Sequence, residues 1–371
     1  MGVSSAQAII PDFVHLNEQI RLVLWFNATI MEIGIGMFGD LSVDANGKRK
    51  PAAQRMEELL AEIKLADELG LDVFALGEHH REDYVVTAPE MVLAAAASVT
   101  RQIKLASAVT VLSSAEPVKV YEDFTALDLL SKGRAEIMAG RGSFIESFPL
   151  YGYDLQDYDR LFEEKLDLLL NINQNEVVNW KGKLRAPLTG QRITPRPYHE
   201  QLRIWIAVGG TPQSVIRAAR LGLPLIIAII GGSPRQFKPL VQLYKDEYKR
   251  SGHDLSQMQI GIHVHSFALH DSQQAADTLF PYYAKQMSKI GKERGWPGYS
   301  REQFEAGRTR EGALFVGSPD EIIEKIQYMH TLFGITRFVA HIDVGGAPHE
   351  SLLRTIELYG TVIAPAVKSL I

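Results

Sequence analysis

The stretch LIIAII at residues 225–230 is apolar at every position. A continuous apolar run of this length, rich in β-branched residues and preceded by Gly222, is typical of a strand that is buried on both faces. Strands of this kind occur in parallel sheets whose faces are covered by helices. The run therefore predicts an α/β fold.

Seven other short apolar runs alternate with amphipathic helical segments. Pro51 opens one of these helices, and Gly70 closes it at the position where glycine most often ends a helix. Eight strand–helix units in 371 residues predict a single (β/α)8 barrel, a TIM barrel, rather than a doubly wound sheet. The predicted strands are residues 32–38, 72–77, 103–109, 135–139, 204–208, 224–229, 259–267 and 337–342.

Two longer intervals interrupt this rhythm, at residues 142–197 and 269–312. The first is rich in Tyr, Asp and Asn, and the second contains GWPG at residues 295–298. We expect both to be insertions at the C-terminal mouth of the barrel. Because active sites of this fold lie at the C-terminal ends of the strands, the functional residues should follow the strands directly.

The barrel domain is expected to span residues 31–371, and residues 1–30 are expected to be an N-terminal extension. One interpretation is that natural translation starts at Met31, which would make the extension a start-site artefact. The apolar stretch at residues 20–31 contains Arg21 and Asn27 and is shorter than the ~20 apolar residues of a membrane span. No small-residue cleavage pattern follows it, so a secretory signal is not indicated either.

The chain contains no cysteine, which excludes disulfides, cysteine nucleophiles, thiolate zinc sites and iron–sulfur clusters. Its 39 basic and 44 acidic residues give a net charge of −5, so no overall field favours nucleic acid or an anionic membrane. This composition fits a cytoplasmic protein. The reactive groups must therefore be histidines, carboxylates, hydroxyls, backbone groups or a bound cofactor.

The second predicted strand ends in EHH at residues 78–80. Neighbouring side chains on a strand point to opposite faces, so we expect only one of His79 and His80 to face the mouth unless the backbone has already turned. Three ionisable residues at a strand end favour function over a purely structural role.

Two features predict an anion site. Arg141 lies between two glycines at the end of the fourth strand, and a guanidinium offers a fork of donors suited to phosphate. The fifth strand runs into GGTPQS at residues 209–214, where the free N–H groups of a helix N-terminus can bind an anion. A surface ion pair and an ordinary capped turn would look similar. In a barrel, however, both features lie on neighbouring strands and can meet at one phosphate.

A different kind of site is indicated by His263 and His265 on the seventh strand and by His341 and Asp343 on the eighth. Each pair has i, i+2 spacing and shares a face, as in a metal-dependent hydrolase barrel. The first strand has no His-x-His, the fourth has no lysine, and HExxH is absent. We therefore expect no metal.

The motifs taken in series resemble the bacterial luciferase-like monooxygenase family over about residues 31–365. No single fragment is specific, but their order and spacing together are. The motifs that carry the resemblance are EHH at 78–80, KLASAV at 104–109, LDLLSKGR at 127–134, GRG at 140–142, GGTPQS at 209–214 and VGSPD at 316–320.

The resemblance implies a flavin mononucleotide (FMN), or in some branches a deazaflavin, at the C-terminal mouth. It implies that Arg141 binds the phosphate and that a non-prolyl cis peptide joins Ala108 to Val109 beneath the flavin ring. His79 matches the histidine beside the reactive edge of the flavin and is the expected catalytic residue. The cofactor-binding residues that we predict are Ser107, Ala108, Val109, Arg141, Gly209, Gly210, Thr211, Gln213 and Ser214.

The function implied is a monooxygenase that uses reduced FMN and O2 to oxygenate a small organic substrate. No Rossmann glycine motif follows a strand, which favours a separate flavin reductase. Gly210 replaces the glutamate that luciferase carries in its phosphate turn, so light emission is not expected. The alternatives are a deazaflavin-dependent dehydrogenase that transfers hydride and a non-catalytic flavin-binding protein. Members of the family are commonly dimers, so a homodimer is expected.

Overall fold

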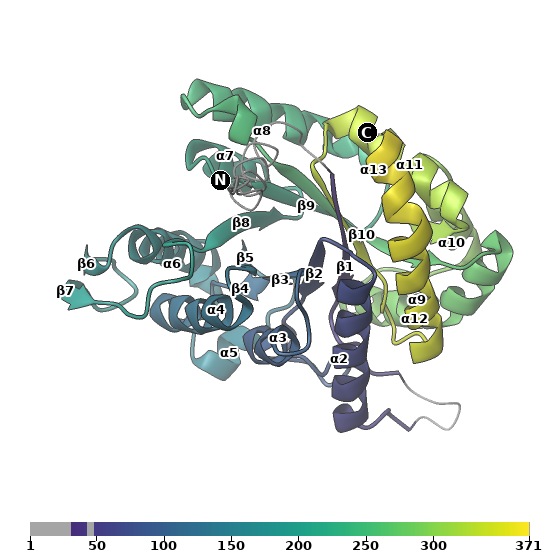
Figure 1. Cartoon of the computed structure of the whole chain (residues 1–371), viewed down its shortest axis with the longest axis horizontal. Coiled ribbons are helices and arrows are strands. Elements are labelled where there is room, and N and C mark those ends of the chain that lie inside the picture. The colour runs from purple at the N-terminus through teal and green to yellow at the C-terminus, as the bar shows by residue number, and fades with distance from the viewer. Residues whose placement is uncertain (1–30, 43–47, 371) are drawn as a thin grey trace, which may run out of the picture.

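The computed structural model describes residues 31–42 and 48–370, so the expectations for residues 1–30 lie outside it. Eight strands form a closed parallel barrel, because each pairs with the next and the last pairs with the first (Figure 1). This confirms the predicted (β/α)8 class. In barrel order the strands are β1 (Glu32–Met37), β2 (Val73–Leu76), β3 (Lys104–Ser107), β5 (Ala135–Gly140), β8 (Arg203–Val208), β9 (Leu225–Ile229), β10 (Ile260–Ala268) and β12 (Arg337–His341).

Helices surround the barrel on its outer side (Figure 1). They cover the apolar outer faces of the strands, which explains why the strands read as continuous apolar runs. In the part of the chain that the structure describes, no helix has the length and apolar character needed to cross a bilayer. The main helices are α2 (Ala52–Glu68), α3 (Pro89–Ala97), α4 (Pro117–Ser131), α6 (Tyr158–Gln174), α7 (Pro212–Arg220), α8 (Lys238–Arg250), α9 (Ser272–Glu293), α10 (Arg301–Arg308), α11 (Pro319–Phe333), α12 (His349–Leu358) and α13 (Ala364–Leu370).

The third predicted strand, residues 103–109, is interrupted. β3 ends at Ser107, and the short strand β4 (Thr110–Val111) then pairs with β5. The peptide bond between Ala108 and Val109 is cis, as the resemblance implied. The break places these two residues at the mouth of the barrel.

Side chains inside the barrel form layers along its axis. The middle layer is apolar and includes Ala106, Met138, Trp205 and Val339. Toward the C-terminal ends of β1 and β5 the interior positions are held by glycines such as Gly36 and Gly140. These glycines let neighbouring side chains approach closely, since a Cβ at Gly36 would lie 2.6 Å from His263 and one at Gly140 would lie 2.7 Å from Val109.

The opposite end of the barrel is closed by an ionic cluster. The fully buried guanidinium of Arg337 contacts Glu136 at 2.5 Å and Glu32 at 2.5 Å. Lys104 pairs with Glu32, and Arg337 also stacks over Trp205 at 4.1 Å from the ring centroid. Binding from this end is therefore blocked, and the chemistry is confined to the C-terminal mouth.

The two predicted insertions have different positions. The second contains α9 and α10, and residues of both line the mouth, as expected. Only the first part of the interval 142–197 does so. Its later part forms a hairpin of β6 (Val177–Trp180) and β7 (Leu188–Arg192), which lies outside α6 (Figure 1). The hairpin stays there because the side chain of Trp180 donates to Asp167 of α6 at 2.7 Å.

Candidate functional site

A cavity of about 1060 Å³ occupies the C-terminal mouth. Pockets for small ligands typically measure ~300–1000 Å³, so this cavity has room for a cofactor together with a substrate. The loops after the strands and the inner face of α9 form its walls. The cavity is therefore where the predicted site residues should converge.

The EHH segment lies in the cavity wall with both of its histidines. His79 and His80 each line the cavity, which corrects the expectation that only one would. The reason is that β2 ends at Leu76, so residues 78–80 have left the extended conformation that imposes alternation. Glu78 binds His80 at 2.8 Å through one oxygen and accepts from the Val111 backbone N–H at 2.9 Å through the other.

His79 lies in an aromatic enclosure. Its ring contacts the rings of Phe38, Tyr84 and Phe144 at centroid distances of 4.5, 4.4 and 5.0 Å. Burial, together with the charges of His341 and Arg81, lowers the pKa of His79 to about 3. Its Nε2 has no hydrogen-bond partner. At neutral pH His79 is therefore an uncharged imidazole that is free to bind a ligand.

The segment around the cis bond forms one wall of the cavity. Ala108 and Val109 line it, together with Gly140 of β5. Ser107 does not, because the alternation along β3 turns its side chain away. Its hydroxyl oxygen accepts from the Thr110 hydroxyl at 2.8 Å and from the Met138 backbone N–H at 3.1 Å. Among the residues predicted here, Ala108 and Val109 are placed to contact a flat ring.

Gly140 is required for this wall. A Cβ at Gly140 would lie 2.7–2.9 Å from side-chain atoms of Val109, closer than real Cβ contacts. We predict that Gly140→Ala displaces Val109 and destabilises the protein by about 1–3 kcal/mol, as overpacking does. Urea unfolding measures this change. The double variant with Val109→Ala removes two of the three close atoms and should recover part of the loss, and a loss that is simply additive would contradict the assigned clash.

The predicted anion site is assembled at the neighbouring strand ends. Arg141 follows β5 and donates to the Thr211 hydroxyl at 3.0 Å, and it also pairs with Asp159. Thr211 is the N-cap of α7, yet its side chain makes no capping hydrogen bond. A Cβ at Gly209 would meet no atom within 4 Å, so the backbone there is open to a ligand. Arg141, Gly209 and Thr211 all line the cavity.

Gly210, Gln213 and Ser214 were also predicted to bind the phosphate. They follow Gly209 in the chain and do not line the cavity. Gly210 has a φ of +128°, a conformation that glycine permits, and it sets the turn into α7. Ser214 is buried, and Gln213 is exposed. A contact from these residues to a phosphate remains a prediction.

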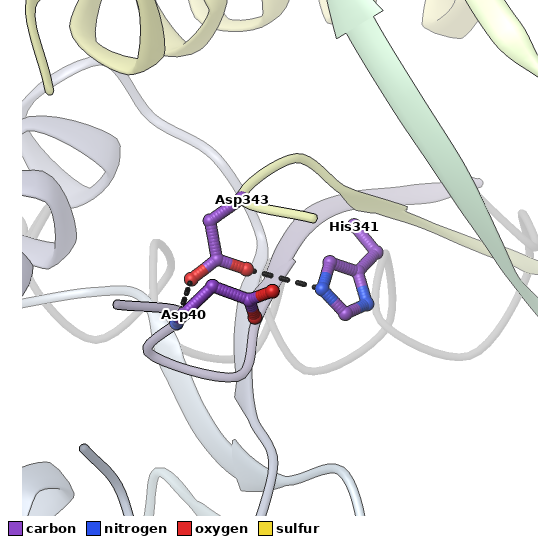
Figure 2. A group of neighbouring side chains, drawn as sticks. All are labelled: Asp40, His341 and Asp343. Atoms are coloured by element: carbon purple, nitrogen blue, oxygen red, sulfur yellow. Dashed lines mark hydrogen bonds and ion pairs between the residues drawn. The ribbon is translucent and has the colours of Figure 1, made fainter. Parts of the chain in front are cut away.

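The four residues of the metal hypothesis also converge on the cavity side of the barrel. The rings of His263 and His265 each lie 5.4 Å from the ring of His341. His341 Nε2 lies 3.0 Å from Asp343 Oδ1, and Asp40 from the end of β1 lies beside this pair (Figure 2). His263, His265, His341 and Asp40 all line the cavity.

Asp40, His341 and Asp343 place one possible ligand atom each within 4.8 Å of one another, which would fit a metal ion. Asp343, however, has no lone pair to offer. Its oxygens already accept from three backbone N–H groups, from His341 and from the guanidinium of Arg55, which lies 3.2 Å away. The positive charge of Arg55 also opposes a cation. The arrangement is better described as a buried hydrogen-bond network.

The pKa values of the two carboxyl groups in this network shift in opposite directions. Burial alone would raise the pKa of Asp343, but its hydrogen bond with His341 and the charges of His341 and Arg55 lower it below the ordinary range. Burial and the charge of Asp343 raise the pKa of Asp40 well above its usual value. Asp343 is therefore the more acidic carboxyl of this pair, and Asp40 is the one that holds its proton to higher pH.

Sequence reasoning missed several residues of the site. Asp40 lies three residues after the first strand, in a loop of the kind that carries functional groups in this fold, so the sequence could have indicated it as a site residue. Arg55 lies among apolar residues on the inner face of α2 and ion-pairs with Glu62 at 2.8 Å. The two residues are seven positions apart, so the sequence could have indicated that they share one face of the helix. Tyr84 and Phe144 come from loops and gave no signal.

A parallel barrel whose C-terminal mouth holds a large cavity, with Arg141, Thr211, Ala108, Val109 and the neutral His79 in its walls, has the architecture of an α/β-barrel enzyme. The chain belongs to the luciferase-like monooxygenase family, whose model matches residues 31–336. It is an oxidoreductase, as its luciferase-like monooxygenase relatives indicate.

Comparison with individual proteins gives a consistent result. N-acetyl-S-alkylcysteine monooxygenase of Bacillus subtilis is 25% identical over 321 residues, covering 82% of this chain and 92% of the relative. Monooxygenase RslO1 from Streptomyces bottropensis has 26% identity and a TM-score of 0.77, covering 90% of this chain and 99% of that structure. The oxygenating constituent of 3,6-diketocamphane monooxygenase from Pseudomonas putida, solved with FMN, shares the fold at 19% identity, with a TM-score of 0.72 and coverage of 91% and 98%.

Proposed function

We propose that this protein takes reduced FMN from a separate reductase and uses O2 to oxygenate a small organic substrate. The observation that carries the proposal is the hydrogen bond from Arg141 to Thr211 at the start of α7, which lies in the same cavity as the wall formed by Ala108 and Val109. An anion cradle beside a wall of small residues is what a flat ring with a phosphate tail requires.

The residues present fit FMN. Arg141, the Thr211 hydroxyl and the open backbone at Gly209 would hold the phosphate, and the N-terminus of α7 adds a favourable dipole. Ala108 and Val109 would support the ring. When bound, the reduced flavin supplies the electrons that activate O2, which no side chain of the protein can do.

The protein's own part is to position groups and exclude water. His79 remains neutral in its aromatic enclosure and offers a ring nitrogen to the reacting centre. Arg81 closes the mouth by binding Glu146 at 2.6 Å and Glu293 of α9 at 2.5 Å. Gln286 of α9 also donates to Asp83 at 3.1 Å. These contacts hold α9 over the cavity, which shields the chemistry from bulk water.

The identity of the flavin is tested by titrating the purified protein with FMN, reduced FMN and the deazaflavin F420. An F420-dependent secondary alcohol dehydrogenase also shares the fold, with 16% identity and a TM-score of 0.68. We expect binding of reduced FMN and no saturable binding of F420. Binding of F420 alone would overturn the proposal in favour of hydride transfer.

Replacing Arg141 with glutamine should weaken FMN binding. A charge-assisted hydrogen bond contributes about 1.5–3 kcal/mol, so the Kd should rise about 10–150-fold. Quenching of FMN fluorescence measures the change. Riboflavin, which has no phosphate, should bind the variant and the parent equally.

Arg220→Gln is the matched control, because Arg220 lies on the same helix, α7, with its side chain 65% exposed. Its FMN affinity should stay within about twofold of the parent. Equal losses for Arg141→Gln and Arg220→Gln would contradict a specific phosphate site. The separate reductase and the homodimer are part of the proposal and are tested by activity with an added NADH-dependent FMN reductase and by light scattering.

A further inference from the structure

The half of the cavity opposite the proposed flavin side carries its own polar group. In the ring of eight strands, β10 and β12 lie directly across from β3 and β5. Asp40 and His341 lie in this half and line the cavity. Their side chains are 4% and 2% exposed, so both are more than nine-tenths buried. We call these two residues the hydroxyl subsite.

The two residues offer complementary hydrogen-bonding atoms. Asp343 is an ionised acceptor, so His341 Nε2 donates the hydrogen that they share, which leaves Nδ1 as the ring nitrogen that can meet a ligand. Asp40 Oδ2 accepts from the Gly345 backbone N–H at 2.7 Å, whereas its Oδ1 has no partner. The raised pKa of Asp40 favours its protonated form, in which Oδ1 can donate. A hydroxyl group both donates and accepts, so it can hydrogen-bond to Asp40 Oδ1 and to the ring of His341.

The surrounding charges exclude an anion. Among the described residues that line the cavity, the only cations are Arg141, at the phosphate cradle, and Arg294, near the C-terminal end of α9. The guanidinium of Arg55 is already bound to Glu62 and Asp343. A buried carboxylate or sulfonate on the substrate would face Asp343 with no free cation nearby, which is costly.

The rest of this half is apolar. Phe38 packs edge-on against His341 with ring centroids 4.0 Å apart, and Met287 and Ile290 of α9 also line the cavity. The neighbouring His265 is uncharged, since burial and the charge of His341 lower its pKa well below the usual value. Its Nδ1 lies 2.9 Å from the Tyr283 hydroxyl. The environment suits an apolar body that carries one polar group.

We propose that Asp40 and His341 form a substrate subsite that binds an uncharged hydroxyl group, phenolic or alcoholic, on a largely apolar substrate. The subsite rests on the proposed function only in that the opposite half of the cavity is assigned to the flavin. Asp343 and Arg55 do not touch the substrate, and they position His341 through the network described above.

The test measures the binding of three aromatic probes of similar size to the FMN-saturated protein by calorimetry at pH 7. 2-Naphthol carries a hydroxyl, 2-methoxynaphthalene keeps the oxygen but has no proton to donate, and 2-naphthoate is an anion. We expect 2-naphthol to bind about tenfold more tightly than either of the others, the equivalent of one satisfied hydrogen bond in a buried site. Equal or tighter binding of 2-naphthoate or 2-methoxynaphthalene would overturn the proposal.

Variants at His341 and Asp40 locate the effect. His341→Phe keeps a ring but removes both nitrogens, and it should abolish the preference for 2-naphthol while leaving the affinity for 2-methoxynaphthalene unchanged. Asp40→Ala should also lose the preference, whereas Asp40→Asn, which keeps a donor, should retain it. His270→Phe at an exposed position is the control and should behave as the parent. Retention of the preference in His341→Phe would overturn the proposal.

The same samples are titrated with FMN, and their thermal unfolding is recorded. FMN binding reports on the proposed function, and the naphthol preference reports on the subsite, so the failure of one is distinguishable from the failure of the other. If His341→Phe fails to fold, the Asp40 pair still decides the matter, because Asp40→Asn keeps a side-chain donor that Asp40→Ala removes.

Discussion

His79→Asn is expected to make the reduced FMN held by the protein react with O2 about 100-fold more slowly, with FMN affinity unchanged. The magnitude is that of removing one positioned donor from a water-excluded site. His79 fits this role because its Nε2 is buried without a partner and its ring is fixed by Phe38, Tyr84 and Phe144. Stopped-flow mixing with O2 measures the change.

His80→Asn is the matched control, because the neighbouring histidine is already bound to Glu78 at 2.8 Å. It should change the reoxidation rate by less than about tenfold. The rate in the parent protein should also be flat between pH 5 and 9, because the pKa of His79 is about 3 and the ring stays neutral throughout this range. A rate that titrates near pH 6.5, or equal effects of the two variants, would contradict the role of His79.

The burial of His79 also has a consequence for stability. Below its ordinary pKa of 6.5, the histidine takes up a proton in the unfolded chain but not in the folded one. His79 therefore lowers the stability of the fold progressively as the pH falls from 6.5 toward 3, and its contribution is constant above 6.5. This direction follows because the pKa is depressed in the folded state.

The barrel could be predicted from the sequence because its signal is local and repeated. Each strand is a short apolar run, and each helix has its own start and stop residues, so each of the eight units can be predicted from its own segment of sequence. The residues on the proposed cofactor side of the cavity could be predicted for the same reason. Arg141 and the turn at residues 209–214 directly follow two neighbouring strands, and the fold then places them together.

The hydrogen-bond network on the opposite side of the cavity could not be predicted, because its contacts join segments that are far apart in the sequence. Asp343 binds Arg55 and the backbone of Asp40 across 288 and 303 residues. The sequence showed His341 and Asp343 on one face, which fits a metal site equally well. Only the partners of Asp343, which saturate its oxygens, favour a hydrogen-bond network over a metal. The position of the hairpin at residues 177–192 likewise depends on long-range contacts with α6 and α4.

Arg337→Met is expected to destabilise the protein by about 3–5 kcal/mol, the cost of leaving buried carboxylates without their partner. Arg337 is fully buried at the end of the barrel opposite the cavity and bridges Glu32 and Glu136. Lys104 lies within 3.9 Å of Glu136 and offsets part of the loss, which favours the lower end of the range. Urea unfolding measures the effect, and Arg192→Met, which breaks an exposed ion pair, should cost less than about 1 kcal/mol.

The pH dependence identifies the cause. Burial raises the pKa of Glu32, but the charges of Arg337 and Lys104 outweigh it and lower the pKa from 4.5 to about 2. The ionised Glu32 therefore stabilises the parent fully above pH 4.5, and this stabilisation is lost as the pH falls from 4.5 toward 2. Without Arg337 the carboxylates protonate more easily, so the difference in unfolding free energy between parent and variant should shrink over this window. A difference that stays constant from pH 7 to 3 would mean that the loss comes from the packing of Arg337 against Trp205 rather than from its charge.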